Sequence, residues 1–271
     1  MRKVRASLLP NLQACQMLFL SKYAEDNDGT GKSNRWADTG NIYHRLTAAF
    51  HLKRSLKAAL KRAAKDFPLG DPQEAWGLFE TYKSYAPKGA VLSCETETFV
   101  EFEGFKFTGT IDLVVRTKGK GIQVVDHKTG KASAPKMIEE YRPQLAVYTW
   151  ITYKKHLEWP ETYINHARTG RMLKIDFTLK EVEKMLYDIV NKLIGIESRV
   201  LPRTAGPHCR YCNVTGCPER STTYSNPRPL TPLATLPQGK NLSWPNQPQT
   251  PEPSQRKALP VLSPTLSRTP R

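Results

Sequence analysis

Charged residues interrupt two short apolar runs between residues 109 and 130. Asp112 lies within the first run, and Asp126 and Lys128 end the second. The runs flank a turn rich in lysine and glycine, which predicts a β-hairpin. Because side chains alternate along a strand, Asp126 and Lys128 share one face and His127 projects to the other. If the hairpin register brings Asp112 to the shared face, two carboxylates and an ammonium group meet, and this arrangement suits a hard divalent cation.

Three further residues strengthen this interpretation. Gly109, just ahead of Asp112, marks a place where other backbone or a ligand passes close to the strand. Gln144 and Tyr148 lie four positions apart on a predicted helix and therefore on one face of it. Each feature alone has an ordinary explanation, such as a strand-end ion pair or a core tyrosine. Together, and in this order, the patterns G-x-x-D, D-x-K and Q-x-x-x-Y resemble the PD-(D/E)XK nuclease superfamily, in particular its RecB-like branch, over roughly residues 10–220.

The resemblance implies a restriction-endonuclease-like α/β core and metal-dependent hydrolysis of phosphodiester bonds. In such a site Asp112 and Asp126 would hold one or two Mg²⁺ or Mn²⁺ ions, together with the backbone carbonyl of His127. RecB-like nucleases take a further metal ligand from a histidine ahead of the hairpin, and His44 matches that motif in the segment 40–44. A lone histidine is otherwise most often structural, so the role of His44 depends on the resemblance.

Lys128, Gln144 and Tyr148 complete the catalytic residues that the resemblance implies. Lys128 would orient or deprotonate the attacking water or stabilise the transition state, while Gln144 and Tyr148 would contact DNA phosphate or position the lysine. The family pattern also offers a glutamate in the strand before G-x-x-D, for which Glu95 and Glu97 are candidates. Both lie in an alternating strand segment, and we expect them to be surface charges rather than metal ligands.

The cysteines near the end of the predicted domain form a second site. Cys209, Cys212 and Cys217 follow the pattern C-x2-C-x4-C, close enough for one metal centre, with Cys15 or His208 as the fourth ligand. Spacing alone does not separate a zinc site from a [4Fe-4S] cluster. One cysteine ahead of the core and three after it resemble the iron-sulfur staple of CRISPR-associated RecB-like and AddB-type nucleases. This resemblance implies a [4Fe-4S] cluster on Cys15, Cys209, Cys212 and Cys217, with structural Zn²⁺ as the alternative.

The charge of the chain indicates a polyanionic partner. Its 271 residues carry a formal net charge of +16 with a pI near 9.7, which favours nucleic acid or an anionic membrane surface. Six cations and no acid lie between residues 53 and 65, as on a phosphate-facing surface or a plain solvated helix face. No apolar run approaches a membrane span, and no segment has the pattern of a signal peptide. We therefore expect a soluble, cytoplasmic protein, and cysteines without a disulfide framework agree with a reducing compartment.

Helical and strand patterns alternate along the chain, which predicts an α/β fold with one mixed central sheet flanked by helices. Helical spacing follows a basic leader within residues 1–24 and recurs in 35–65, 75–84, 136–153 and 178–198; strand patterns occupy 91–107, the hairpin, 161–165 and 172–177. Pro143 marks a second place where the helix over 136–153 can begin.

The last part of the chain differs from the rest. Residues 221–271 hold 11 of the 21 prolines, and such a segment buries too little apolar surface to order itself. We expect a nuclease domain over 1–220, its ends joined by the cysteine centre, and a disordered basic tail over 221–271 that tethers DNA or binds a protein partner.

These features predict a metal-dependent DNA exonuclease that acts on single strands or duplex ends. By resemblance, such an enzyme serves phage or prokaryotic recombination, repair or CRISPR adaptation. The alternative is a non-catalytic nucleic-acid-binding protein on the same fold, with structural zinc in place of the iron-sulfur cluster. Two carboxylates facing phosphate favour the enzyme, because they repel the polyanion that a binding protein must attract.

Overall fold

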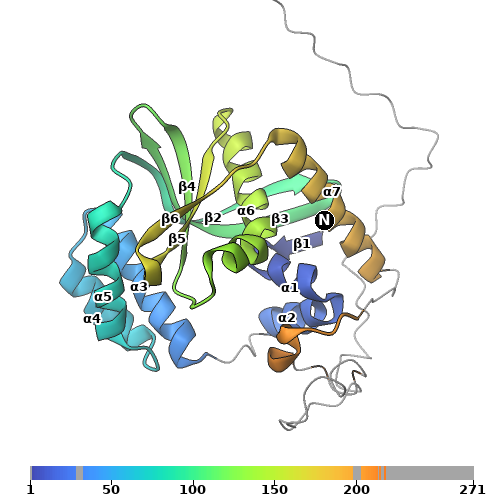
Figure 1. The fold of residues 1–271 in the computed structure, drawn as a ribbon, viewed down its shortest axis with the longest axis horizontal. Coiled ribbons are helices and arrows are strands. Elements are labelled where there is room, and N and C mark those ends of the chain that lie inside the picture. The colour runs from blue at the N-terminus through green and yellow to red at the C-terminus, as the bar shows by residue number, and fades with distance from the viewer. Residues whose placement is uncertain (1, 29–32, 198–202, 213, 215–216, 218–271) are drawn as a thin grey trace, which may run out of the picture.

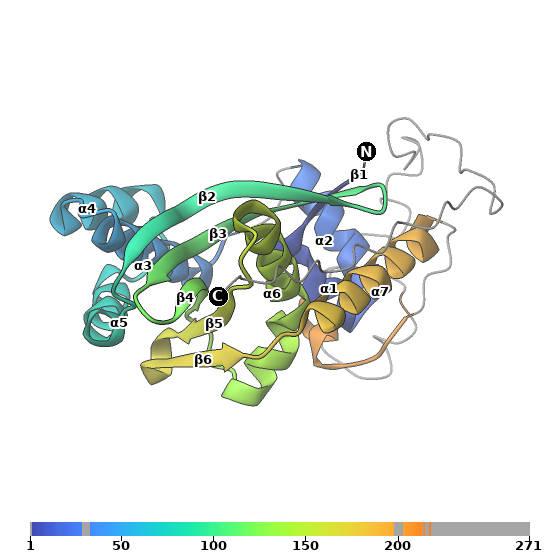
Figure 2. The same cartoon turned by 90° about the horizontal axis from the view of Figure 1, so that it is seen from above.

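The computed structural model describes residues 2–28, 33–197, 203–212, 214 and 217. The segment 221–271, predicted as a disordered tail, lies outside these residues. Within them the chain forms a six-stranded mixed sheet with helices packed around it, which confirms the predicted α/β fold class (Figures 1 and 2). The strands are β1 (Arg2–Arg5), β2 (Ala90–Phe102), β3 (Phe105–Thr117), β4 (Gly121–Lys128), β5 (Glu161–His166) and β6 (Arg171–Ile175).

Strand β3 is paired with three other strands. β2 runs antiparallel along the whole of one edge of β3. The other edge is shared, because β1 pairs in parallel with residues 105–108 and β4 pairs antiparallel with residues 113–117. Residues 109–112 of β3 therefore have no strand beside them on this edge in the described part of the chain. The sheet continues from β4 through a parallel β5 to an antiparallel β6.

Alternation along the central strands gives the sheet two different apolar faces. Val114 and Val124 belong to the larger core, in which the sheet packs against α1, α2, α6 and α7, while Leu113 and Val125 point the other way into a smaller cluster. The helices are α1 (Leu9–Ala14), α2 (Gln16–Asp28), α3 (Arg35–His51), α4 (Leu56–Asp66), α5 (Pro72–Tyr85), α6 (Ala134–His156) and α7 (Leu179–Glu197).

Helices α3, α4 and α5 form a core of their own. Ile42, Tyr43 and Phe79 are fully buried at its centre. Figures 1 and 2 place these three helices together at one end of the molecule, away from α2 and α7. Helix α3 thus approaches the sheet from that end, and it carries the candidate metal ligand His44.

The single helix predicted over residues 35–65 is wrong, because the chain forms α3 and α4 instead. The two helices are separated by a turn in which Lys53 adopts a left-handed φ of 53°. Ser55 then caps α4, since its side chain accepts a hydrogen bond from the Ala58 backbone N–H. The apolar spacing runs through this turn almost unbroken, which is why periodicity alone did not reveal it.

Two other elements differ from the sequence-based expectation. The basic leader is strand β1, whose Val4 is fully buried against β3. The helix that follows is broken at Cys15, where the backbone is extended with φ −166°. Helix α6 begins at Ala134 and keeps Pro143 in its interior, so Pro143 is not its start. None of the helices in the described part of the chain combines the length and apolar character that crossing a bilayer requires.

Candidate active site

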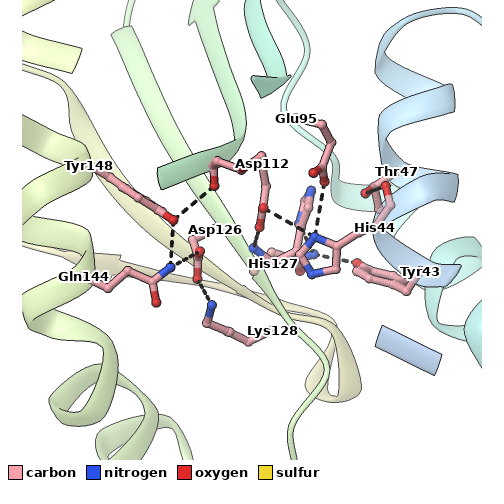
Figure 3. A network of polar contacts seen from close by, with 12 residues as sticks. Tyr43, His44, Thr47, Glu95, Asp112, Asp126, His127, Lys128, Gln144 and Tyr148 are labelled. Carbon is pink, nitrogen blue, oxygen red and sulfur yellow. Dashed lines mark hydrogen bonds and ion pairs between the residues drawn. The ribbon is translucent and has the colours of Figure 1, made fainter. Parts of the chain in front are cut away.

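The predicted acids meet at the end of the β3–β4 ladder, beside the stretch of β3 that pairs only with β2 among the described strands. Leu113 pairs with Val125, so the next positions along the antiparallel ladder, Asp112 and Asp126, lie opposite each other. The His127 backbone N–H donates a hydrogen bond of 2.6 Å to Asp112 Oδ2, which ties the two strands together at this point. Figure 3 shows both carboxylates between helix α3 on one side and α6 on the other.

Three side chains beside this pair form a group that suits a metal ion. His44 Nδ1 lies 3.3 Å from Glu95 Oε1 and 3.4 Å from Asp112 Oδ1, and one ligand atom from each residue falls within 4.8 Å of the other two. The residues come from α3, β2 and β3. Two carboxylates and an imidazole are a donor set that a divalent cation accepts, and the side chain of His44 stays 27% exposed, so a cation can reach it.

Glu95 corrects the expectation that both glutamates of β2 are surface charges. Its backbone has φ 48°, a left-handed conformation that a non-glycine residue adopts at a cost of about 1–2 kcal/mol. The pairs on either side, Cys94 with Leu113 and Thr96 with Ile111, keep one register, so Glu95 lies opposite Asp112, and its carboxylate contacts His44. Glu97 keeps the expected place, with its side chain 75% exposed near Lys3.

Protonated His44 offsets part of the negative charge in this group. Burial favours neutral His44, but Asp112 and Glu95 outweigh it and raise the pKa of His44 to about 10. Burial likewise opposes ionised Asp112, yet His44, His127 and Lys128 hold the pKa of Asp112 well below its usual range. Protonated His44 therefore offsets one of the two carboxylate charges, and a metal ion that binds to its Nδ1 must release that proton.

Asp126 and Lys128 form a buried ion pair next to the group. Lys128 Nζ lies 2.7 Å from Asp126 Oδ2 and 4.3 Å from the centre of the Tyr141 ring. Burial raises the pKa of Asp126 to about 6, and Asp112 adds to this rise while Lys128 opposes it. Burial would lower the pKa of Lys128, but Asp126 and Tyr141 raise it above the ordinary value. Lys128 is consequently an ammonium group at neutral pH.

Gln144 and Tyr148 reach the site from one face of α6, as their spacing predicted. Gln144 Nε2 donates to Asp126 Oδ1 at 3.2 Å and to the Tyr148 hydroxyl at 3.1 Å. The Tyr148 hydroxyl donates to the Thr110 carbonyl at 3.0 Å, on the part of β3 that pairs with β2 but with neither β1 nor β4. A Cβ atom on Gly109 would lie only 2.6 Å from Tyr148 Cε1. The close approach predicted at Gly109 is therefore made by this tyrosine ring.

The His127 ring projects to the face of the sheet opposite the Asp126 and Lys128 side chains. Its Nδ1 lies 2.9 Å from Asn165 Nδ2, which also donates to the Tyr43 hydroxyl at 2.6 Å. Burial lowers the pKa of His127 to about 3, so the ring is neutral and accepts from Asn165 through Nδ1. The sequence did not single out Tyr43 or Asn165, although the alternation along β5 places Asn165 on this face.

The predicted cysteine ligands lie close together, at the opposite end of the domain from α3–α5. Cys15, Cys212 and Cys217 share one small apolar cluster. Burial raises the pKa of the Cys212 thiol, and Cys15, Cys217 and Cys209 contribute to the rise, so Cys212 is within electrostatic reach of the other three thiols. His208, the other candidate for a fourth ligand, is instead hydrogen-bonded to the Thr204 carbonyl at 2.8 Å.

Comparisons with known proteins agree with this arrangement. A model of the PD-(D/E)XK nuclease superfamily matches residues 6–217. A solved structure from Eubacterium rectale, provisionally named an exonuclease, has 13% sequence identity and a TM-score of 0.52, and the match covers 85% of this chain and 91% of that one. SSO0001 has 15% sequence identity and a TM-score of 0.36, and the match covers 76% of this chain and 94% of that one. No curated protein gives a significant match.

The E. rectale structure shows the fold alone, because its sequence identity is low. The family model covers most of the chain and includes every residue of the site around Asp112 and Asp126. The chain belongs to the PD-(D/E)XK nuclease superfamily.

Proposed function

We propose that this nuclease is a metal-dependent DNA exonuclease of the RecB-like branch. The observation that carries the proposal is the metal-ligand group of His44, Glu95 and Asp112 beside the Asp126–Lys128 pair. Together with the motifs around Asp112, Asp126 and Lys128, a histidine on a helix ahead of the hairpin is a feature that this chain shares with the RecB-like branch. The name of the E. rectale neighbour supports the choice of exonuclease.

The side chains divide the work of hydrolysis between them. His44, Glu95 and Asp112 would hold Mg²⁺ or Mn²⁺, with Asp126 and the His127 carbonyl completing the ligands. The donor set fits because two carboxylates and an imidazole nitrogen converge within 4.8 Å of one another. Held by these residues, a divalent ion would supply a water of lowered pKa and would stabilise the charge of the scissile phosphate. The protein holds these ligands in place through the hydrogen bond from the His127 backbone to Asp112.

Lys128 acts as a cation in this proposal rather than as a base. Its pKa is raised by Asp126, so it keeps its proton at neutral pH and donates hydrogen bonds to the attacking water or to the phosphate oxygens. Gln144 and Tyr148 hold Asp126 and β3 in position. Of the roles that the resemblance implies for these two residues, the hydrogen bonds favour positioning.

The positive charge of the chain supports DNA as the substrate. All six cations between residues 53 and 65 are exposed, on α4 and the turn before it. Such a surface binds backbone phosphates without reading sequence, which an exonuclease requires.

The test is degradation of linear and circular DNA with Mg²⁺, Mn²⁺ or EDTA. We expect wild type to degrade linear DNA with either metal and to leave covalently closed circles intact. Asp126→Asn and Asp112→Asn should each abolish cleavage while the circular-dichroism spectrum stays native. Asp176→Asn, whose carboxylate is 85% exposed, is the matched control and keeps full activity. Cleavage by purified Asp126→Asn would contradict the assigned site, and cleavage of closed circles would contradict the exonuclease.

We also propose that Cys15, Cys209, Cys212 and Cys217 bind a [4Fe-4S] cluster, with Zn²⁺ as the alternative. Cys15, Cys212 and Cys217 pack in one cluster, and four thiolates are a ligand set that both centres accept. The arrangement of one cysteine ahead of the core and three after it, by its resemblance to the iron-sulfur staple, favours the [4Fe-4S] cluster.

Metal analysis after anaerobic purification distinguishes these two centres. The cluster predicts a brown protein with about four irons per chain, and stoichiometric zinc in a colourless protein would refute it. Cys94 lies on β2, outside the cysteine group. Cys15→Ser should therefore lose the metal, while Cys94→Ser retains it.

A further inference from the structure

An exposed tryptophan surrounded by cations lies near the active site. Trp36, in the first turn of α3, is 54% exposed. Lys131 Nζ lies 4.6 Å from the centre of its ring, and the guanidinium carbons of Arg168 and Arg35 lie 5.7 Å and 5.8 Å from it. A single exposed apolar side chain is ordinary by itself, but the three cationic groups around this indole suit an anionic ligand that carries an aromatic ring.

The two arginines are fixed in place by other residues, while the lysine is exposed. Arg35 pairs with Asp71 at 2.8 Å, and Arg168 donates to the Thr129 carbonyl at 2.7 Å and pairs with Glu74. These contacts hold the surroundings of Trp36 rigid. Lys131 is exposed on the segment after β4, and its flexible stem allows the ammonium group to move from the ring to a nearby phosphate.

Both elements that carry this group also carry residues of the active site. Trp36 lies eight residues before His44 on α3, which is about 12 Å along the helix axis. Lys131 lies three residues after Lys128. The two segments pack closely between these points, since a Cβ atom on Gly40 would lie 3.0 Å from Thr129 Oγ1. Trp36 therefore lies within the length of a few nucleotides from the active site.

We propose that Trp36 stacks on an unpaired base of single-stranded DNA, with Lys131 holding the adjacent phosphate. The inference rests on the proposed function, because it takes the substrate to be DNA. Stacking needs an accessible aromatic face and a base with a free face, and it does not depend on sequence. Bases inside a duplex have both faces covered, so this site selects single strands or frayed ends.

The test measures binding in EDTA, so that no result depends on cleavage. Fluorescence anisotropy compares a labelled oligo(dT), the same oligomer with abasic sites, and a blunt hairpin duplex. Trp36→Ala should bind oligo(dT) about 5- to 100-fold more weakly than wild type, and Trp36→Phe should lose less. On the abasic oligomer and the duplex, wild type and Trp36→Ala should bind equally. Phe99→Ala is the matched control. Phe99 is also 54% exposed, and Lys106 Nζ lies 3.7 Å from the centre of its ring, but Phe99 lies on β2.

Three results would overturn the inference. They are unchanged binding of oligo(dT) by Trp36→Ala, an equal loss on the abasic oligomer or the duplex, and a loss of the same size in Phe99→Ala. If Trp36→Ala does not fold, wild type alone still tests the inference, because stacking requires wild type to bind the abasic oligomer more weakly than oligo(dT). A Trp36 effect in a protein that cleaves nothing overturns only the proposed nuclease activity, and cleavage without a Trp36 effect overturns only the stacking site.

Discussion

Replacing Gly109 with alanine tests whether Tyr148 positions the active site. The new methyl carbon would lie 2.6 Å from Tyr148 Cε1, and ordinary contact needs about 3.5 Å or more. The ring must therefore move by about 1 Å, although Tyr148 is only 2% exposed and packed on all sides. Overpacking of this kind costs about 1–3 kcal/mol, and the hydrogen bond to the Thr110 carbonyl adds about 1 kcal/mol. We expect Gly109→Ala to lower the free energy of unfolding by about 2–4 kcal/mol.

Urea unfolding and DNA cleavage measure the two consequences of this change. Cleavage should fall about tenfold or more, because a shift of about 1 Å in a positioning group has effects of that size, and Gln144 links Tyr148 to Asp126. Gly77→Ala is the control, since its Cβ would meet nothing within 4 Å, and in helix α5 it should stabilise the protein by up to about 1 kcal/mol. In a Tyr148→Ala background the cost of Gly109→Ala should nearly vanish. An undiminished cost there would refute the reasoning.

Three further predictions concern the metal sites and pH. Glu95→Gln should raise the Mn²⁺ concentration for half-maximal cleavage at least about tenfold, and Glu97→Gln should not; equal titration curves would remove Glu95 from the site. Burial lowers the pKa of His51 from 6.5 to about 4. The contribution of buried, neutral His51 to the free energy of unfolding is therefore complete above pH 6.5 and is lost as the pH falls toward 4. Urea unfolding across this range should show a smaller loss of stability in His51→Gln than in wild type, and parallel curves would contradict this. Cys15→Ser should lower the melting temperature of the metal-loaded protein more than Cys94→Ser does, as calorimetry can measure.

The hairpin residues could be placed from the sequence because they obey simple alternation. A glycine- and lysine-rich turn between two apolar runs fixes the pairing of β3 with β4, and this pairing sets Asp112 opposite Asp126. The same rule correctly turns the His127 ring to the other face. Helical spacing placed Gln144 and Tyr148 on one face of α6, where both reach Asp126 or its neighbourhood.

Glu95 could not be placed in this way because its position breaks the rule. Regular alternation gives Glu95 and Glu97 the same face, whereas Glu95 has a left-handed backbone and lies beside His44 and Asp112. Such a conformation has no signal in a strand pattern when the residue is not glycine. The break between α3 and α4 was missed for a related reason: Ser55 is a recognisable cap, but the apolar periodicity on both sides of it hid the interruption.

The ligand group of His44, Glu95 and Asp112 joins three elements that are distant along the chain. His44 precedes Glu95 by 51 residues. It lies on α3, which packs into the core of α3–α5, whereas the two acids belong to the sheet. An ion bound by all three crosslinks these parts, so the free energy of its binding adds to the free energy of unfolding. At a concentration one hundred times its dissociation constant the ion would contribute about 2.7 kcal/mol. The supply of divalent cation would then set the thermal resistance of this enzyme as well as its turnover.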